Sequence, residues 1–196
     1  TNFVNTNYQV NVTVTQKPDE SITLKSGWNF VSTPKKLANP KADSFFSDIK
    51  TGGKAVKKWD AKKQDWAEVS PDEAIQPLTG YWIYSENEAA LNFIYSKEIP
   101  APLPDTTVYK GWNAVGDTGS TIETAAHIFG NIDWPSAEVF NLTTLELTTV
   151  WKDKAADETI PKYSGIWLYV NDEEKGFIFS SNRIFFRHAD FLRRQG

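Results

Sequence analysis

The sequence contains no cysteine and no methionine among its 196 residues. Without cysteine the chain cannot form disulfides, cysteine-ligated zinc sites or iron–sulfur clusters, and it has no thiolate nucleophile. Because methionine is missing even at position 1, we expect a processed or excised piece of a longer protein. No run approaches the ~20 apolar residues of a membrane helix, so we do not expect this piece to span a bilayer.

Histidine is also scarce, and basic residues are outnumbered by acidic ones. Nucleophile triads and imidazole metal sites depend on histidine, and only His127 and His188 are present. We expect His127 on the polar side of a helix, and His188 lies in the C-terminal tail, so neither is assigned a catalytic role. Residues 1–180 hold 17 lysines against 24 acidic residues, which argues against binding of nucleic acid.

Aromatic residues are abundant, and they reveal an internal duplication. The chain is 40% hydrophobic and 14% aromatic with eight tryptophans, which predicts a folded protein. Gly27-Trp28-Asn29 recurs as Gly111-Trp112-Asn113, and residues 66–84 align without a gap on residues 151–169. These matches indicate two copies of one unit, offset by about 84 residues.

The duplication divides the chain into five segments. Copy one spans residues 19–99 and copy two residues 106–180, with a proline-rich linker over 100–105. Residues 1–18 contain an alternating strand, which is either the last strand of a preceding β-sandwich domain or an edge strand of a sheet in this chain or a neighbour. Residues 181–196 hold all four arginines and are either a docking helix or a segment foreign to the natural protein.

The predicted fold class is mainly β (β-rich α+β), a tandem duplication of a ~75-residue antiparallel unit with one short helix each. Strands are expected over residues 22–33 and 107–116. Helices are expected over 40–49, capped by Asn39, and over 121–130, capped by a box of Ser120 and Glu123. In copy one, hairpins are expected to join residues 55–59 to 66–69 and 81–84 to 91–95. Because one such unit buries too little surface alone, the copies are expected to pack together.

The repeated motifs carry a family resemblance. Gly27-Trp28-Asn29 followed by Gly80-Tyr81-Trp82-Ile83-Tyr84, seen again in copy two, resembles modules of secreted archaeal and bacterial surface proteins, with methanogen envelope and S-layer-associated proteins as the nearest likeness. Copy two departs from the pattern at Ile166, which replaces the middle tyrosine. The resemblance implies an extracellular address, a structural or adhesive role, and a preceding immunoglobulin-like PKD domain that residues 8–15 would end. It implies no catalytic set.

Carboxylate pairs are the remaining candidates for catalysis, because a glycosidase needs only two carboxyl groups. The pair Asp72-Glu73 recurs as Asp157-Glu158 in a turn before a strand, where a shared fold preserves residues for solvation or capping. The acidic turn 172–174 is interpreted as solvated surface in preference to a Ca²⁺ site. We therefore predict no enzyme activity, no catalytic residue, no metal site and no cofactor.

Tryptophan is the most informative residue type. Six of the eight form equivalent pairs between the copies (28 with 112, 66 with 151, 82 with 167), which predicts that these six belong to the shared core. Trp59 and Trp134 have no tryptophan counterpart. They are therefore the candidate glycan-binding platforms if the chain is a carbohydrate-binding module, although packing in the core is the favoured interpretation of each.

Two N-glycosylation sequons begin at Asn11 and Asn141, and both are candidate modification sites. The function expected first is a non-catalytic extracellular module with a structural or adhesive role in a cell envelope or S-layer. The alternative is a carbohydrate-binding accessory module of a secreted enzyme. Expected partners are other cell-surface proteins, a second copy of the chain, or glycans.

Self-association is expected to depend on charge. Residues 21–98 hold 11 lysines against 10 acidic residues, whereas residues 106–180 hold 5 lysines against 11 acidic residues. A basic hairpin over residues 54–63 of one molecule could contact the acidic copy two of the next, and salt would weaken this contact. Ordinary solvated surface is the favoured interpretation of these charges, and the contact between molecules is the alternative.

Overall fold

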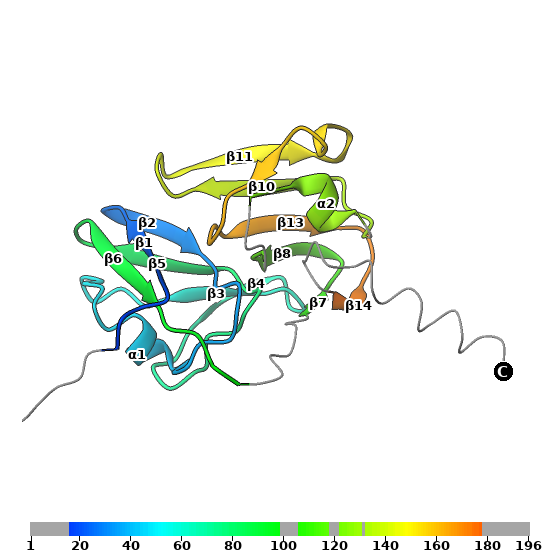
Figure 1. Cartoon of the computed structure of the whole chain (residues 1–196). Helices are drawn as coiled ribbons and strands as arrows, with labels where there is room; N and C mark the ends of the chain where they lie inside the picture. Colours follow the sequence, from blue (N-terminus) through cyan, green and yellow to red (C-terminus); the bar gives the residue numbers. More distant parts are fainter. Residues whose placement is uncertain (1–15, 99–105, 118–121, 131, 178–196) are drawn as a thin grey trace, which may run out of the picture.

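The computed structural model describes residues 16–98, 106–117, 122–130 and 132–177 (Figure 1). Its strands form antiparallel sheets and its helices are short, which confirms the mainly β fold class. Among the described residues, no helix has the length and apolar character needed to cross a membrane.

Strand order supports the duplication. Each copy contains a four-stranded antiparallel sheet, and the two sheets have the same order (Figure 1). In copy one the order is β2 (Gly27–Val31), β5 (Tyr81–Ser85), β3 (Lys57–Asp60) and β4 (Asp65–Glu68). In copy two it is β8 (Gly111–Val115), β13 (Ile166–Val170), β10 (Ser136–Asn141) and β11 (Glu146–Trp151).

A two-stranded ribbon accompanies each sheet. In copy one, β1 (Glu20–Leu24) pairs with β6 (Ala89–Phe93), and in copy two, β7 (Thr106–Val108) pairs with β14 (Glu174–Phe177). Copy two adds a short pair of β9 (Glu123–Thr124) with β12 (Thr159–Ile160). The expected hairpin of residues 81–84 with 91–95 is therefore wrong, because β5 pairs with β2 and β3 while β6 pairs with β1.

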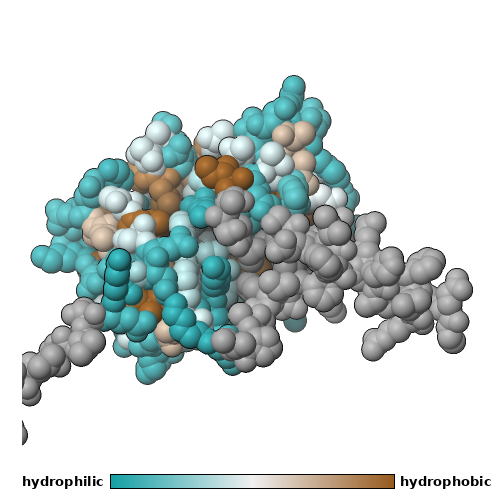
Figure 2. Space-filling model, viewed as in Figure 1, coloured by the Kyte–Doolittle hydropathy of each residue, from teal (hydrophilic) through white to brown (hydrophobic). Residues whose placement is uncertain are grey.

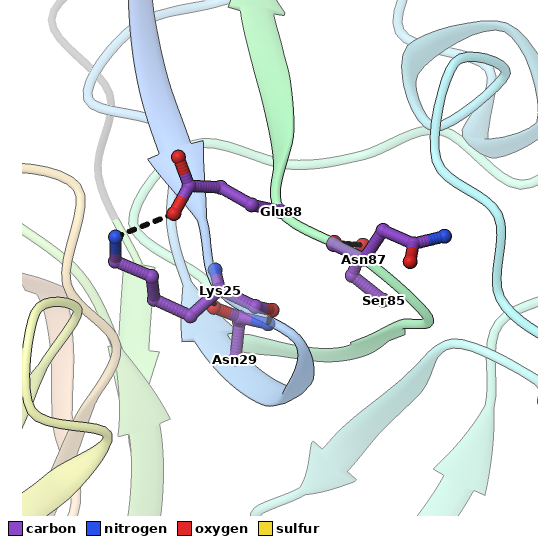
Figure 3. Close-up of polar contacts among 5 residues, drawn as sticks. All are labelled: Lys25, Asn29, Ser85, Asn87 and Glu88. Atoms are coloured by element: carbon purple, nitrogen blue, oxygen red, sulfur yellow. Dashed lines mark hydrogen bonds and ion pairs between the residues drawn. The ribbon is translucent and has the colours of Figure 1, made fainter.

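One long strand was expected at the start of each copy, but the structure has two, β1 and β2 in copy one and β7 and β8 in copy two. The Gly-Trp-Asn motif explains this break. Gly27 and Gly111 have φ angles of +109° and +99°, so the chain turns sharply before each motif. Asn29 is buried; its Oδ1 accepts from the Lys25 N–H at 3.0 Å, and its Nδ2 donates to the Lys25 carbonyl at 2.8 Å. Figure 3 shows Asn29 beside Lys25, whose ammonium donates to the carboxylate of Glu88 at 2.6 Å. Asn113 makes the same two bonds to Tyr109, at 2.8 and 2.7 Å. The asparagine therefore pins the turn that starts each sheet.

One short helix is present in each copy, as expected, but both helices are shorter than predicted. They are α1 (Ala42–Phe45) and α2 (Ala125–Phe129), and a 3₁₀ turn over Lys152–Lys154 follows β11. The first helix has no side-chain cap, so Asn39 does not act as one. The second is capped by Thr124, whose hydroxyl accepts from the His127 N–H at 3.3 Å. The expected capping box is wrong, because Glu123 lies in β9; its partner Ser120 lies outside the described residues.

The two copies exchange core residues. Leu78 of copy one is fully buried in the apolar cluster of copy two, and Tyr163 of copy two is buried in the cluster of copy one, 4.6 Å from the ring of Phe93. Both residues have left-handed φ angles, +62° for Leu78 and +64° for Tyr163. Non-glycine residues rarely adopt this conformation, so tertiary packing enforces it at both positions.

Backbone hydrogen bonds link the two copies at their junction. The Gly165 N–H donates to the Phe30 carbonyl at 2.8 Å, and the Gly80 N–H donates to the Ala114 carbonyl at 3.0 Å. The ring of Phe30 fills the centre of this junction. A Cβ added at Gly165 would lie 2.3 Å from that ring, and one added at Gly80 would lie 2.6 Å from it. Glycine is therefore required at both positions, which explains why it recurs in the two copies.

Candidate functional site

A tryptophan-lined hollow of about 350 Å³ lies between the two copies. Trp59 and Trp66 reach it from copy one, and Trp112 and Trp167 reach it from copy two. Glu138 is the fifth lining residue, and among the described residues it is the one charged side chain on the wall. The face of the molecule that is visible in Figure 2 is mainly hydrophilic, and its hydrophobic residues form small patches.

Strand register determines how the tryptophans meet. Trp59 of β3 lies opposite Trp66 of β4, and Trp167 of β13 lies opposite Glu138 of β10. The rings of Trp59, Trp66 and Trp167 are mutually 5.3 Å apart, centroid to centroid, with interplanar angles of 80°, 80° and 89°. Edge-to-face packing of this kind is a favourable geometry for aromatic pairs, so the rings hold one another in place.

Hydrogen bonds attach the β3–β4 hairpin of copy one to β8 of copy two. The Trp59 indole Nε1–H donates to the carbonyl of Trp112 at 2.8 Å. Gln64, in the hairpin turn, donates through Nε2 to the same carbonyl and accepts from the Trp112 N–H through Oε1, both at 2.8 Å. The hollow therefore requires both copies, because each contributes two of its four rings.

The walls of the hollow combine buried and exposed surface. The Trp66 side chain is 47% exposed, whereas Trp59, Trp112 and Trp167 are half-buried. The Oε1 atom of Glu138 accepts from the Thr149 hydroxyl at 2.9 Å. No ion pair neutralises Glu138 within the part of the chain that the structure describes.

The structural alignment of the copies differs from the sequence alignment at this hairpin. Lys57 lies opposite Trp82 just as Glu138 lies opposite Trp167, so β3 and β10 correspond at these residues. Counting from them makes Phe140 the counterpart of Trp59 and Leu147, which lies opposite Phe140, the counterpart of Trp66. The pairing of Trp66 with Trp151 is therefore wrong, because 15 residues separate Trp66 from Trp82 in copy one, whereas 19 residues separate Leu147 from Trp167 in copy two.

The two predicted glycan platforms have different outcomes. Trp59 lines the hollow, but Trp134 is 1% exposed and packs 5.1 Å from the ring of Phe129, so it cannot act as a platform. The expectation that all paired tryptophans are core residues is also wrong, since Trp28, Trp66 and Trp151 are among the exposed large hydrophobic residues. Duplication indicated shared positions, but not whether each position faces the core or the solvent.

Sequence reasoning missed three of the four rings and Glu138. The available signal was the local spacing of Trp59 and Trp66, which are separated by a polar turn and so predict a cross-strand tryptophan pair. The contribution of Trp112 and Trp167 depends on the packing of one copy against the other, which no local pattern encodes.

Of the two sequons, the structure describes the second. Asn141 is exposed at the end of β10, and its Oδ1 accepts from the Thr143 N–H at 2.8 Å and from the Thr144 N–H at 3.2 Å. Asn11 lies outside the described residues, as does His188. His127 is exposed on α2, and its Nε2 lies 3.8 Å from a carboxylate oxygen of Glu123.

The repeated acidic pairs lie away from the hollow. Asp72 forms an exposed ion pair with Lys41 at 2.8 Å, and the hydrogen bond from this ammonium lowers the pKa of Asp72. Glu73 pairs with Lys58. The backbone carbonyl of Glu73 accepts from the first helical N–H of α1 at 2.9 Å, and that of Glu158 does the same for α2 at 2.8 Å. The repeated pair thus serves the shared fold through its backbone.

Three lysines of the basic hairpin are engaged within copy one. Lys58 pairs with Glu73, Lys63 lies 3.1 Å from Asp60, and the Lys54 ammonium lies 4.1 Å from the ring centroid of Tyr84. A contact between molecules through this hairpin would have to compete with these interactions.

Comparisons with protein-family models, with curated proteins and with solved structures gave no match for this chain. Among the described residues, no group of three or more histidine, aspartate or glutamate side chains is arranged to hold a metal ion. The tryptophan-lined hollow is therefore considered on its own geometry.

Proposed function

We propose that this chain is a non-catalytic, extracellular cell-surface module whose adhesive function is to bind carbohydrate in the tryptophan-lined hollow. The observation that carries the proposal is the convergence of four tryptophans from both copies on one open hollow, where Trp66 keeps 47% of its surface exposed. Exposed clusters of large apolar side chains on a soluble domain commonly mark interaction sites.

Carbohydrate suits this surface for a physical reason. One face of a pyranose ring presents C–H groups with partial positive charge, and the face of an indole ring carries the complementary negative charge. Because the hollow is open at Trp66, the sugar hydroxyls remain hydrated when the apolar face of the sugar stacks on the ring. The rings are fixed by their mutual packing, so binding costs little conformational entropy.

The polar groups of the hollow favour binding over hydrolysis. Glycosidases typically use a pair of carboxyl groups about 5–9.5 Å apart, whereas the part of the chain that the structure describes places a single carboxylate, Glu138, on the wall. Asp72 and Glu73, the strongest sequence candidates, are held in ion pairs with lysines of copy one.

The extracellular address is a proposal that depends on the resemblance of the Gly-Trp-Asn modules to envelope proteins. Exposure of the Asn141 sequon in the β10–β11 turn is compatible with glycosylation of a surface protein. Sugar binding in the hollow would give such a module an adhesive role toward a glycan of the same or a neighbouring cell.

Titration with oligosaccharides tests the proposed function. Trp66→Ala is expected to weaken binding roughly 5- to 150-fold, if stacking of a sugar ring on Trp66 matches the gain of about 1–3 kcal/mol that a nucleic-acid base obtains on an aromatic side chain. Trp151→Ala is the matched control, since Trp151 is 56% exposed and does not line the hollow. Intrinsic fluorescence and calorimetry measure both variants against β-1,4-linked tetrasaccharides. Failure of every tetrasaccharide to bind, or equal losses in the two variants, would refute the proposal.

A further inference from the structure

The charge of the hollow narrows the class of sugar. Glu138 is fixed at the wall by its place in the centre of the sheet, opposite Trp167 on one side and Thr149 on the other. One oxygen is occupied by the Thr149 hydroxyl, and no cation among the described residues forms an ion pair with the carboxylate. A carboxylate beside aromatic rings gains most from a ligand that brings a positive charge.

The duplication places a second surface in the position that corresponds to the hollow, and its side chains differ in charge and in aromatic content. The counterpart of Glu138 is Lys57, and the counterparts of Trp59 and Trp66 are Phe140 and Leu147. Thus the carboxylate of Glu138 lies in the hollow that four tryptophans line. Lys57 lies in the corresponding surface, where a phenylalanine and a leucine replace two of the tryptophans. Lys57 itself lies opposite Glu68 on the neighbouring strand, which provides it with a local countercharge.

The surroundings of Glu138 add to this preference. Residues 106–180 hold 5 lysines against 11 acidic residues, so the copy that carries Glu138 is strongly acidic. A field of this sign attracts cationic ligands and repels anionic ones. The hairpin of copy one that carries Trp59 and Trp66 is basic, but none of its lysines, all of which the structure describes, lines the hollow, and Lys58 and Lys63 are paired with Glu73 and Asp60. The carboxylate of Glu138 therefore sets the charge of the wall and favours a cationic sugar.

We propose that the ligand is an amino sugar with a free, protonated amine, whose ammonium group pairs with Glu138 while its ring stacks on the tryptophans. This inference rests on the proposed function and adds to it the chemical class of the sugar. The ammonium gains a charge-assisted hydrogen bond to Glu138 and a cation–π contribution from the adjacent indole rings. Acetylation of the amine removes both gains.

Three tetrasaccharides with the same β-1,4 backbone separate charge from shape. The tetramer of glucosamine carries amines, the tetramer of N-acetylglucosamine carries neutral amides, and cellotetraose carries hydroxyls at the same positions. At pH 6 the glucosamine tetramer is expected to bind about tenfold tighter than the other two, since hydrogen bonds to charged groups contribute more than neutral ones. Calorimetry measures all three with the complete chain.

Glu138→Gln tests the assigned residue, because its amide oxygen still accepts from Thr149 and its charge is lost. We expect this variant to bind all three tetramers with the weaker affinity, and Glu146→Gln, an exposed acidic control on β11, to keep the tenfold preference. Equal affinity of the wild type for the three tetramers, or an unchanged preference in Glu138→Gln, would overturn the amino-sugar inference and leave the proposed function standing. No binding of any tetramer would overturn both.

Discussion

The exchange of Leu78 and Tyr163 predicts that the two copies unfold together. Leu78 belongs to copy one by sequence but is fully buried in the apolar cluster of copy two. Leu78→Ala removes this anchor and leaves a cavity, which typically costs 2–5 kcal/mol for a buried leucine. Alanine does not relieve the left-handed backbone at this position, where φ is +62°, so no gain offsets the loss.

Urea unfolding followed by tryptophan fluorescence and by circular dichroism measures the effect. In thermal unfolding, a loss of about 2–5 kcal/mol corresponds for a domain of this size to a fall in the midpoint of roughly 4–20 °C. The wild type and the variant are both expected to show one transition that is coincident in the two probes.

Leu24→Ala is the matched control, because Leu24 is equally buried but lies in the cluster of its own copy. If the copies form one cooperative unit, both substitutions lower the same transition. Two separate transitions, with Leu78→Ala moving one and Leu24→Ala moving the other, would refute the interlocked arrangement.

Further predictions concern the junction and alkaline pH. Gly165→Ala places a Cβ against the ring of Phe30 and is expected to cost about 1–3 kcal/mol of unfolding free energy; Phe30→Ala in the same chain removes the clash, so additive losses in a double-mutant cycle would contradict the packing. Burial raises the pKa of Tyr81 to about 12 from an ordinary 10.0, so its stabilisation is complete below pH 10 and is lost as the pH rises toward 12. Tyr81→Phe should therefore lose less stability than the wild type between pH 9 and 11.5 in urea unfolding, and parallel curves would refute this assignment.

The sequence predicted the duplication, the mainly β class and the β3–β4 hairpin, because these depend on repeated motifs and on local alternation. It did not predict the break before Gly27, because the left-handed glycine and the buried Asn29 act together only once the turn has formed. Partners of β5 and β6 were also assigned wrongly. Adjacent strands of a sequence often form hairpins, but here the ribbon of β1 with β6 leads the chain away from the sheet.

The site was predicted only in part. Trp59 was named as a candidate platform because it lacked a counterpart, and it does line the hollow. Trp134 was named for the same reason, yet it fills the core beside Phe129. Whether a tryptophan faces the core or the partner copy depends on which sheet face is covered, and that depends on the packing of the copies.

The most direct test of the tryptophan-lined hollow as a glycan-binding site is a titration of the complete chain, labelled with ¹⁵N, followed through the indole N–H resonances of its eight tryptophans. With the glucosamine tetramer we expect the resonances of Trp59, Trp66, Trp112 and Trp167 to shift together along one binding isotherm. The buried Trp134 and the exposed Trp151 should stay unchanged and serve as internal controls. Shifts confined to Trp151, or no shift in the four hollow residues at saturating tetramer, would contradict the proposed site.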